Sequence, residues 1–240
     1  MIIAKNIRLL KKSEANKYYK RNMYYYNEGR DLPSFEKNKI EPGGSTDFII
    51  DCFKTTKIKV NNILEIGCAN GRKLEKYKAY FKSKKQYVNC YGIDLSSLAI
   101  KNGKKKYKNL KLFNYSSLQI SKFKTKFDLI ICGYFLYLLD REYLFKQFDL
   151  IFERLNTNGH LLIVDFDPLF PHHNKSGHNK KLNIYKMNLK NFIEASNLFK
   201  SIYLHKWEIS NTFKKKFISS DISVALFQKI NFERDFPKNL

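Results

Sequence analysis

Short apolar runs recur along the chain with helix-like segments between them. Five runs have the length of buried strands, at 62–66, 87–93, 109–113, 127–133 and 160–166. The segments between them place apolar residues at intervals of three and four. Strands that alternate with helices predict a parallel sheet with helices on both of its faces, which is an α/β fold.

The clearest helix is predicted over residues 141–155, REYLFKQFDLIFERL. Its residues Leu144, Phe148, Ile151 and Leu155 fall on one face, as in an amphipathic helix that packs on a sheet. We expect this helix to connect the fourth and fifth strands.

The two ends of the chain depart from this alternation. Near the carboxyl terminus the pattern predicts a helix at about 188–199 and strands at about 202–208 and 222–229, which would close the sheet. The first residues are aromatic and charged without a clean period. We interpret residues 1–45 as a cap on the carboxyl edge of the sheet, and 46–240 as one domain of ordinary size.

Composition limits the location and the redox chemistry. No apolar stretch approaches the roughly 18 residues of a membrane span, and the amino terminus lacks the features of a signal peptide. We therefore expect a cytoplasmic protein without a membrane partner. The four cysteines occur singly, so we interpret them as buried free thiols and expect no metal site; they are Cys52, Cys68, Cys90 and Cys132.

The formal net charge of +23 raises the question of a nucleic-acid partner, because a basic surface attracts phosphates. Lysine, asparagine, isoleucine, phenylalanine and tyrosine are all abundant, whereas glycine (10) and proline (5) are scarce. An A+T-rich genome produces this composition whatever the function. We attribute the charge to composition and keep nucleic acid as an alternative partner.

The segment NILEIGCANGRKLEKY, residues 62–77, carries the first sign of a ligand. A carboxylate and two glycines, Glu65, Gly67 and Gly71, stand where the first strand turns into its helix. A dinucleotide-binding turn would place glycines at 67, 69 and 72, and this chain has alanine and arginine at the last two. The turn therefore suits a ligand that approaches the backbone without a pyrophosphate.

A second carboxylate supports a ribose-containing ligand. Asp94, in YGIDLSS, ends the second predicted strand 23 residues after Gly71. A carboxylate at this point can accept hydrogen bonds from both ribose hydroxyls. The competing interpretation is that Asp94 caps the following helix, a role that Ser96 or Ser97 could also fill.

These segments resemble the class I S-adenosylmethionine-dependent methyltransferases. EIGCANG is similar to the family's acidic and glycine motif, with Ala69 in place of the middle glycine, and GIDLS is similar to its ribose motif. FNYSSL, FDLIICGYFLYLLDRE and LNTNGHLLIVDF resemble the adenine, fourth-strand and fifth-strand segments, in order, up to about residue 166. GYFLYLLDRE, DFDP and YKM further resemble bacterial enzymes that methylate small molecules.

The resemblance implies a Rossmann-like fold with a seven-stranded, mostly parallel sheet. It also implies S-adenosylmethionine as methyl donor and S-adenosylhomocysteine as product, and it gives Glu65 an indirect role near the methionine amino group. The cofactor-binding residues it implies are Glu65, Gly67, Cys68, Ala69, Asn70, Gly71, Asp94, Leu95, Tyr115, Ser116, Cys132 and Gly133.

The absence of two sequence features restricts the class of methyl acceptor. The Asn/Asp-Pro-Pro-aromatic motif of enzymes that methylate exocyclic amines of bases is replaced by CGYF, and no paired cysteines suit methylation of a pyrimidine carbon. We therefore predict transfer to an oxygen or nitrogen of a small-molecule metabolite. An RNA methyltransferase that uses the basic surface and a non-catalytic S-adenosylmethionine-binding protein are the alternatives.

The segment 165–187, which follows the fifth strand, is interpreted as a polar substrate lid. Three histidines lie within seven residues, and histidine is well suited to take a proton near neutral pH. The competing interpretations are a solvated loop and an adventitious metal site, and Asp165 competes as a base. The candidate catalytic residues are His172, His173, His178 and Tyr137.

Overall fold

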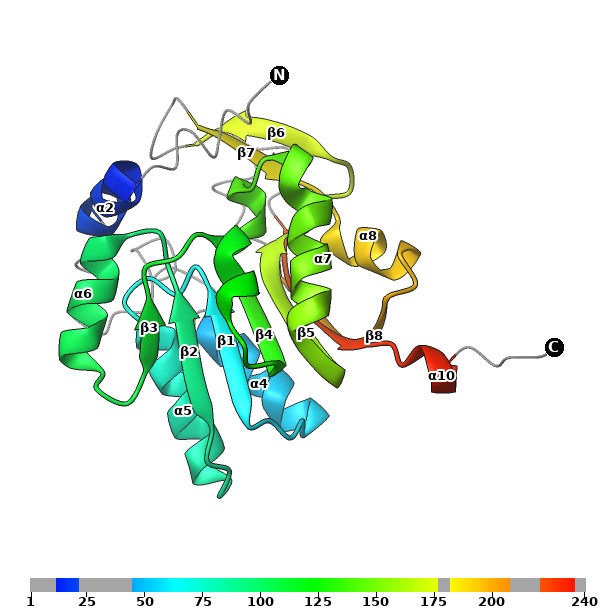
Figure 1. Cartoon of the computed structure of the whole chain (residues 1–240). Coiled ribbons are helices and arrows are strands. Elements are labelled where there is room, and N and C mark those ends of the chain that lie inside the picture. The colour runs from blue at the N-terminus through cyan, green and yellow to red at the C-terminus, as the bar shows by residue number, and fades with distance from the viewer. Residues whose placement is uncertain (1–11, 22–44, 177–181, 208–220, 236–240) are drawn as a thin grey trace.

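The computed structural model describes four stretches of the chain, residues 12–21, 45–176, 182–207 and 221–235. These stretches contain a seven-stranded sheet with helices on both faces (Figure 1). The predicted fold class, an α/β fold with a mostly parallel seven-stranded sheet, is confirmed.

The sheet has the strand order β3-β2-β1-β4-β5-β9-β8. Strands β1 to β5 pair in parallel, whereas β9 lies antiparallel to both β5 and β8. The direction in which successive strands are added to the sheet reverses between β1 and β4. Open α/β sheets bind their ligands at such a point. The strands are β1 (Asn62–Ile66), β2 (Asn89–Ile93), β3 (Lys111–Phe113), β4 (Phe127–Gly133), β5 (Leu155–Phe166), β8 (Phe199–Trp207) and β9 (Ile222–Lys229).

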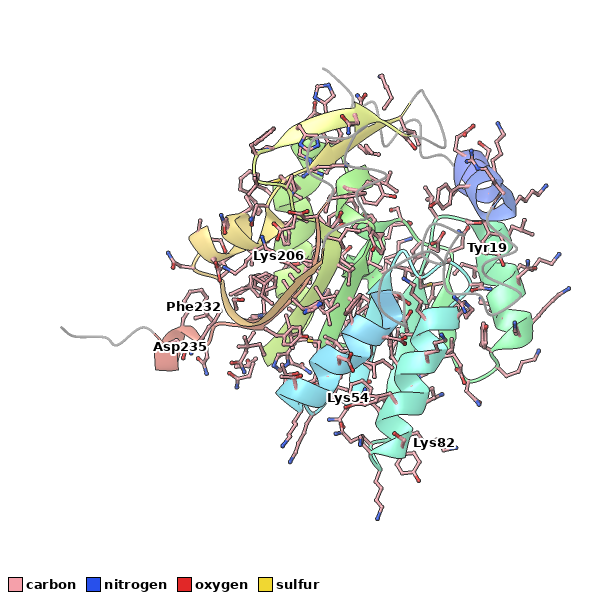
Figure 2. All side chains as sticks on the ribbon, turned by 180° about the vertical axis from the view of Figure 1, so that it is seen from behind. Tyr19, Lys54, Lys82, Lys206, Phe232 and Asp235 are labelled. Carbon is pink, nitrogen blue, oxygen red and sulfur yellow. The ribbon has the colours of Figure 1, made fainter. Side chains whose placement is uncertain are left out.

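Helices cover the two faces of the sheet in separate layers, as the opposite views in Figures 1 and 2 show. One layer consists of α4 (Ser45–Thr56), α5 (Arg72–Ser83) and α6 (Ser97–Lys106). The other consists of the 3-10 helix η1 (Ser117–Lys122), α7 (Leu144–Arg154) and α8 (Leu189–Ala195). Among the described residues, no helix is long and apolar enough to span a membrane.

Strand alternation explains why both faces are covered. Ile63 packs in the core under α4 and α5, whereas the next residue, Leu64, packs in the core under α7. Both are fully buried, as expected for central strands of a parallel sheet. The four cysteines are buried and free, as predicted.

Several element boundaries differ from the predicted ones. Strand β5 begins at Leu155 rather than 160, because Leu155 already pairs with Phe127 across a register shift in β4. The predicted helix over 141–155 begins with a short 3-10 turn, η3 (Arg141–Tyr143), before α7. Long-range strand pairing, which local periodicity does not contain, accounts for the longer β5.

The predicted lid is a β-hairpin rather than a loop. Strand β6 (His172–Lys175) pairs antiparallel with β7 (Asn183–Lys186) in a two-stranded sheet of their own. Strand β7 packs against η2 (Leu136–Leu138), the 3-10 turn that follows β4. The apolar pattern missed these strands because their segments, HHNK and NIYK, are mainly polar.

The amino-terminal helix α2 (Lys12–Arg21) packs against α6. The side-chain oxygen of Asn16 accepts hydrogen bonds from the Leu98 N–H (3.0 Å) and the Ser96 hydroxyl (2.8 Å). Figure 1 shows α2 at the same end of the molecule as the hairpin. The rest of the predicted cap at residues 1–45, residues 1–11 and 22–44, lies outside the described residues.

Candidate active site

The glycine turn after β1 is fixed to the end of the neighbouring strand. The N–H groups of Gly67 and Cys68 both donate to the Ile93 carbonyl, at 2.9 and 3.0 Å, and the Gly71 N–H donates to the Cys68 carbonyl at 2.8 Å. Gly67 and Gly71 have φ values of 78° and 82°, a left-handed conformation that favours glycine. The two predicted glycines therefore stand where the backbone requires them.

Ala69 adopts the conformation of the glycine that it replaces. Its φ is 49°, and its N–H donates to Asp94 Oδ2 at 2.9 Å. The next residue, Asn70, is buried, and its side-chain oxygen accepts the Arg72 N–H at 3.2 Å. The turn thus keeps the family's shape and is tied by a hydrogen bond to the predicted ribose carboxylate.

The stability of the protein should respond differently when one methyl group is added at Gly71 and when one is removed at Ala69. A Cβ at Gly71 would lie 2.8 Å from Leu110 Cδ1, so Gly71→Ala adds a clash to left-handed strain. We expect it to lower the free energy of unfolding by about 1–3 kcal/mol. Ala69→Gly relieves the left-handed backbone strain at this residue but increases the backbone entropy of the unfolded chain. These effects oppose each other, so the free energy of unfolding should change by no more than about 1 kcal/mol. Urea unfolding measures both, and equal losses would contradict the assigned strain.

Glu65 brings a buried carboxyl to the base of the turn. It is 3% exposed, and its Oε2 atom has no hydrogen-bond partner among the described residues. Burial raises the pKa of Glu65 to about 7, although Lys73 nearby lowers it. A buried carboxyl with an unused acceptor fits a ligand that supplies a cation or a hydrogen-bond donor.

Asp94 lies beside the turn at the end of β2. Its Oδ1 accepts the Ser96 N–H at 2.7 Å and its Oδ2 accepts the Ala69 N–H. Burial raises the pKa of Asp94, and these two backbone bonds oppose the shift. A carboxylate has about four acceptor positions, so capacity remains on both oxygens.

The alternative role for Asp94, as the cap of α6, is filled by another residue. The Ser96 hydroxyl accepts the Ala99 N–H at 3.1 Å and is the N-cap of that helix. Asp94 is therefore available to a ligand in addition to the turn, and its ribose contact stays a prediction.

Asn114 is a further member of this group that sequence reasoning missed. Its amide nitrogen donates to the backbone carbonyls of Asp94 and Leu95, at 2.9 and 3.0 Å. It thereby fixes the backbone of two predicted cofactor-binding residues. Its place directly after β3 was the only sequence signal for this role.

The predicted adenine segment follows β3. The Tyr115 ring stacks on Phe113 with centroids 5.5 Å apart, and Lys122 lies over its ring at 5.2 Å. Ser116 forms a capping box with Gln119 at the start of η1. This structural role explains a serine at 116, and its contact with a cofactor stays a prediction.

The end of β4 supplies the other predicted cofactor residues. Cys132 is fully buried in the core, whereas an added Cβ at Gly133 would meet nothing within 4 Å. Open space at Gly133 suits a ligand, and any Cys132 contact stays a prediction.

Phe135 is a neighbour of the glycine turn that the sequence analysis missed. A Cβ on Gly67 would lie 3.5 Å from the Phe135 side chain, so the turns after β1 and β4 meet there.

The turn after β4 holds Tyr137 over the end of β5. The Tyr137 N–H donates to Asp165 Oδ2 at 3.1 Å, and its ring meets Phe166 edge-on at 5.2 Å. Asp165 is 2% exposed, and burial raises its pKa to about 7, against hydrogen bonds and Arg141 that lower it. Asp165 therefore holds the Tyr137 backbone of this turn in place.

The hairpin separates two of the three candidate histidines. His172 Nδ1 lies 3.1 Å from the Phe170 carbonyl, and its Nε2 is buried without a hydrogen-bond partner among the described residues. His173 is exposed, on the opposite face of the strand. His178 lies outside the described residues, which contain no group of three metal-ligating side chains.

Comparison with known proteins places this geometry in a family. A family model described as a methyltransferase domain matches residues 32–233. A search of curated protein sequences finds no match to this chain.

Three solved structures illustrate the similarity of fold. The N-methyltransferase NodS from Bradyrhizobium japonicum WM9 with S-adenosyl-l-homocysteine is 18% identical, with coverage of 90% of this chain and 99% of that one and a TM-score of 0.61. A Burkholderia thailandensis 1,6-didemethyltoxoflavin-N1-methyltransferase is 10% identical, with coverage of 96% and 92% and a TM-score of 0.63. An O-methyltransferase from a trans-AT PKS multienzyme of Brevibacillus brevis is 13% identical, with coverage of 80% and 81% and a TM-score of 0.54.

The family model spans most of the sequence, and the described part has the sheet, the glycine turn and the strand-end carboxylate predicted for such an enzyme. The chain therefore belongs to the methyltransferase domain family, and its fold is that of the class I S-adenosylmethionine-dependent enzymes.

Proposed function

We propose that this methyltransferase transfers a methyl group from S-adenosylmethionine to an oxygen or nitrogen atom of a small-molecule metabolite. The observation that carries the proposal is the joined set of Glu65, the left-handed glycine turn and Asp94. Glu65 has a buried oxygen that accepts no hydrogen bond among the described residues, and it fits the ammonium group of the cofactor. The backbone of the glycine turn carries only small side chains and fits the methionine portion. Asp94 is a carboxylate with acceptor positions left, and it fits the ribose.

Different residues would bind the cofactor and the methyl acceptor. When bound, the cofactor supplies a methyl group on a sulfonium that is already activated for transfer. Glu65 would hold the methionine end, and Asp94 would accept the ribose hydroxyls. The acceptor would lie between the glycine turn and the hairpin, where positioning provides most of the catalysis.

A hydroxyl or amine acceptor must also lose a proton, and we propose His172 for this role. A hydrogen bond from Nδ1–H to the Phe170 carbonyl orients the ring and leaves Nε2 with a free lone pair. Nε2 can then accept the proton as the acceptor is methylated. Tyr137, which is held by Asp165 at the neighbouring turn, is the competing residue.

A small acceptor is supported over RNA by the position of the hairpin and by one of the relatives named above. The hairpin packs on η2 at the carboxyl ends of β4 and β5, beside the proposed acceptor position. The Burkholderia thailandensis enzyme named above is a methyltransferase of 1,6-didemethyltoxoflavin, a small molecule.

A labelling experiment tests the proposal directly. Purified protein would be incubated with methyl-labelled S-adenosylmethionine and, separately, with a metabolite extract and with total RNA. We expect label in a small product only. Label in RNA would replace the proposal with the RNA methyltransferase alternative. Tight cofactor binding without any labelled product would replace it with the non-catalytic binding protein.

The cap is proposed on the contacts of α2. Asn16 binds the first turn of α6, which begins three residues after Asp94, so α2 stands beside the proposed ribose position. We propose that residues 1–45 form a cap on the carboxyl edge of the sheet, with residues 46–240 as the methyltransferase domain.

Cofactor binding near neutral pH should release a proton from Glu65. The pKa of this buried carboxyl is about 7, so it is partly protonated in the free protein. A bound ammonium group favours the carboxylate and lowers that pKa. Affinity should therefore rise as the pH increases toward about 7 and level off above it. Calorimetry in two buffers of different ionisation enthalpy would measure the released proton.

Glu65→Gln provides the matched control for this prediction. The amide keeps the shape of the side chain but cannot titrate. Its binding enthalpy should not depend on the buffer, and its affinity should be flat with pH in this range. A buffer dependence that persists in Glu65→Gln would show that another group releases the proton.

A further inference from the structure

The β6–β7 hairpin packs on the turn that follows β4 and on the end of β5. Its two strands pair with each other, and in the described part of the chain neither pairs with the seven-stranded sheet. Strand β7 packs on η2, and Lys186 of β7 lies 4.3 Å from the centre of the Phe166 ring at the end of β5. The side chains at that contact decide how firmly the hairpin is held over the acceptor position.

Arg141 is at the centre of the contact. Its Nη2 atom donates to the carbonyls of Leu136 and Leu139, at 2.6 and 2.9 Å, one at the start of η2 and one directly after it. Its Nη1 atom lies 3.0 Å from the sulfur of Met187, and its guanidinium lies 5.1 Å from the centre of the Tyr185 ring. One side chain therefore binds the turn after β4 and the hairpin strand β7 together.

Asp165 completes the arrangement from the opposite side of the turn. Its carboxylate accepts the Tyr137 N–H, while Arg141 binds the turn's carbonyls. Burial lowers the pKa of Arg141, and the negative charge of Asp165 opposes that shift. The donors and acceptors of the η2 backbone are thus held by two oppositely charged side chains.

We propose that Arg141 is a positioning residue that couples the β6–β7 hairpin to the turn that carries Tyr137. The proposal rests on the proposed function, because it concerns how the acceptor side of that site is held. A planar guanidinium can donate to two carbonyls and still lie against a ring and a sulfur. A lysine amine cannot satisfy all four contacts at once.

The coupling should be confined to the acceptor side. The glycine turn is fixed independently, by the Ile93 carbonyl and by Asp94. Loss of Arg141 should therefore loosen η2 and the hairpin together and leave cofactor affinity unchanged. This pattern separates a positioning role from general destabilisation, which would affect both halves of the site.

The test compares Arg141→Met and Arg141→Lys with a matched control, Arg154→Lys. Arg154 also donates to a backbone carbonyl, that of Phe123 at 2.9 Å, but on the far end of α7. Hydrogen–deuterium exchange would be followed at residues 134–139 and 182–187, and cofactor affinity would be measured by calorimetry. Single-turnover methyl transfer would be measured with the acceptor found by labelling.

For Arg141→Met we expect exchange in both segments to accelerate by about tenfold or more, because two charge-assisted hydrogen bonds are lost. Transfer should slow by about 10–100-fold at unchanged cofactor affinity. Arg141→Lys should fall between it and the wild type, and Arg154→Lys should match the wild type in both segments. Acceleration in only one segment, or equally across the sheet, would overturn the coupling. Exchange and affinity decide this point even if no acceptor is methylated.

Discussion

Replacement of His172 by alanine is expected to lower the rate of methyl transfer by about 10²–10⁴-fold at unchanged affinity for S-adenosylmethionine. The reason is the asymmetry of its ring, with Nδ1 at the Phe170 carbonyl and Nε2 buried without a partner among the described residues. Single-turnover methyl transfer measures this rate.

His173→Ala is the matched control, because it removes the same side chain from the exposed face of the same strand. We expect its rate to equal that of the wild type. If both variants retain wild-type rates, the hairpin only covers the acceptor. A comparable loss of rate in Tyr137→Phe instead would identify Tyr137 as the base.

Asp94→Ala should weaken S-adenosylmethionine binding by about 1.5–3 kcal/mol for each ribose hydrogen bond lost, less what water restores. The side chain also accepts the N–H groups of Ala69 and Ser96, so its removal loosens the glycine turn as well. Both effects act in the same direction. Calorimetric titration measures the affinity, and a thermal melt confirms that the variant is folded.

Two controls separate charge from shape at this position. Asp94→Asn keeps one acceptor oxygen for the backbone and should lose less affinity than Asp94→Ala. Asp149→Ala removes an exposed carboxylate on α7 that forms an ion pair with Lys146, and it should bind like the wild type. Unchanged affinity in a folded Asp94→Ala protein would remove Asp94 from the cofactor site.

The glycine turn and the strand-end carboxylate of the candidate site were predictable from sequence because their structure is local. Gly67 and Asp94 directly follow strands and Gly71 precedes α5, where an α/β alternation places its ligand, and backbone conformation restricts the residue type at both glycines. Even the departure at Ala69 was readable, because a residue with one methyl group still enters the left-handed turn.

The acceptor half was not predictable to the same degree. The hairpin consists of polar segments with no apolar alternation, and its pairing joins residues 8 to 14 positions apart, such as His173 and Tyr185. Arg141 looked like an ordinary residue in a helical segment, and only the folded chain brings it to Met187. Long-range contacts of this kind leave no periodic signal in one sequence.

The β6–β7 hairpin also suggests how this enzyme could be given a new substrate. It enters after Phe166 and leaves before Leu189, both of which belong to the main sheet or its helices. Because its strands pair with each other, exchanging the segment between those points would interrupt no backbone ladder that holds the cofactor. A graft that keeps a tyrosine and a methionine to receive Arg141 should fold on the same platform. Substrate choice could then be varied in a library of some twenty residues, while the methyl-donor site is inherited unchanged.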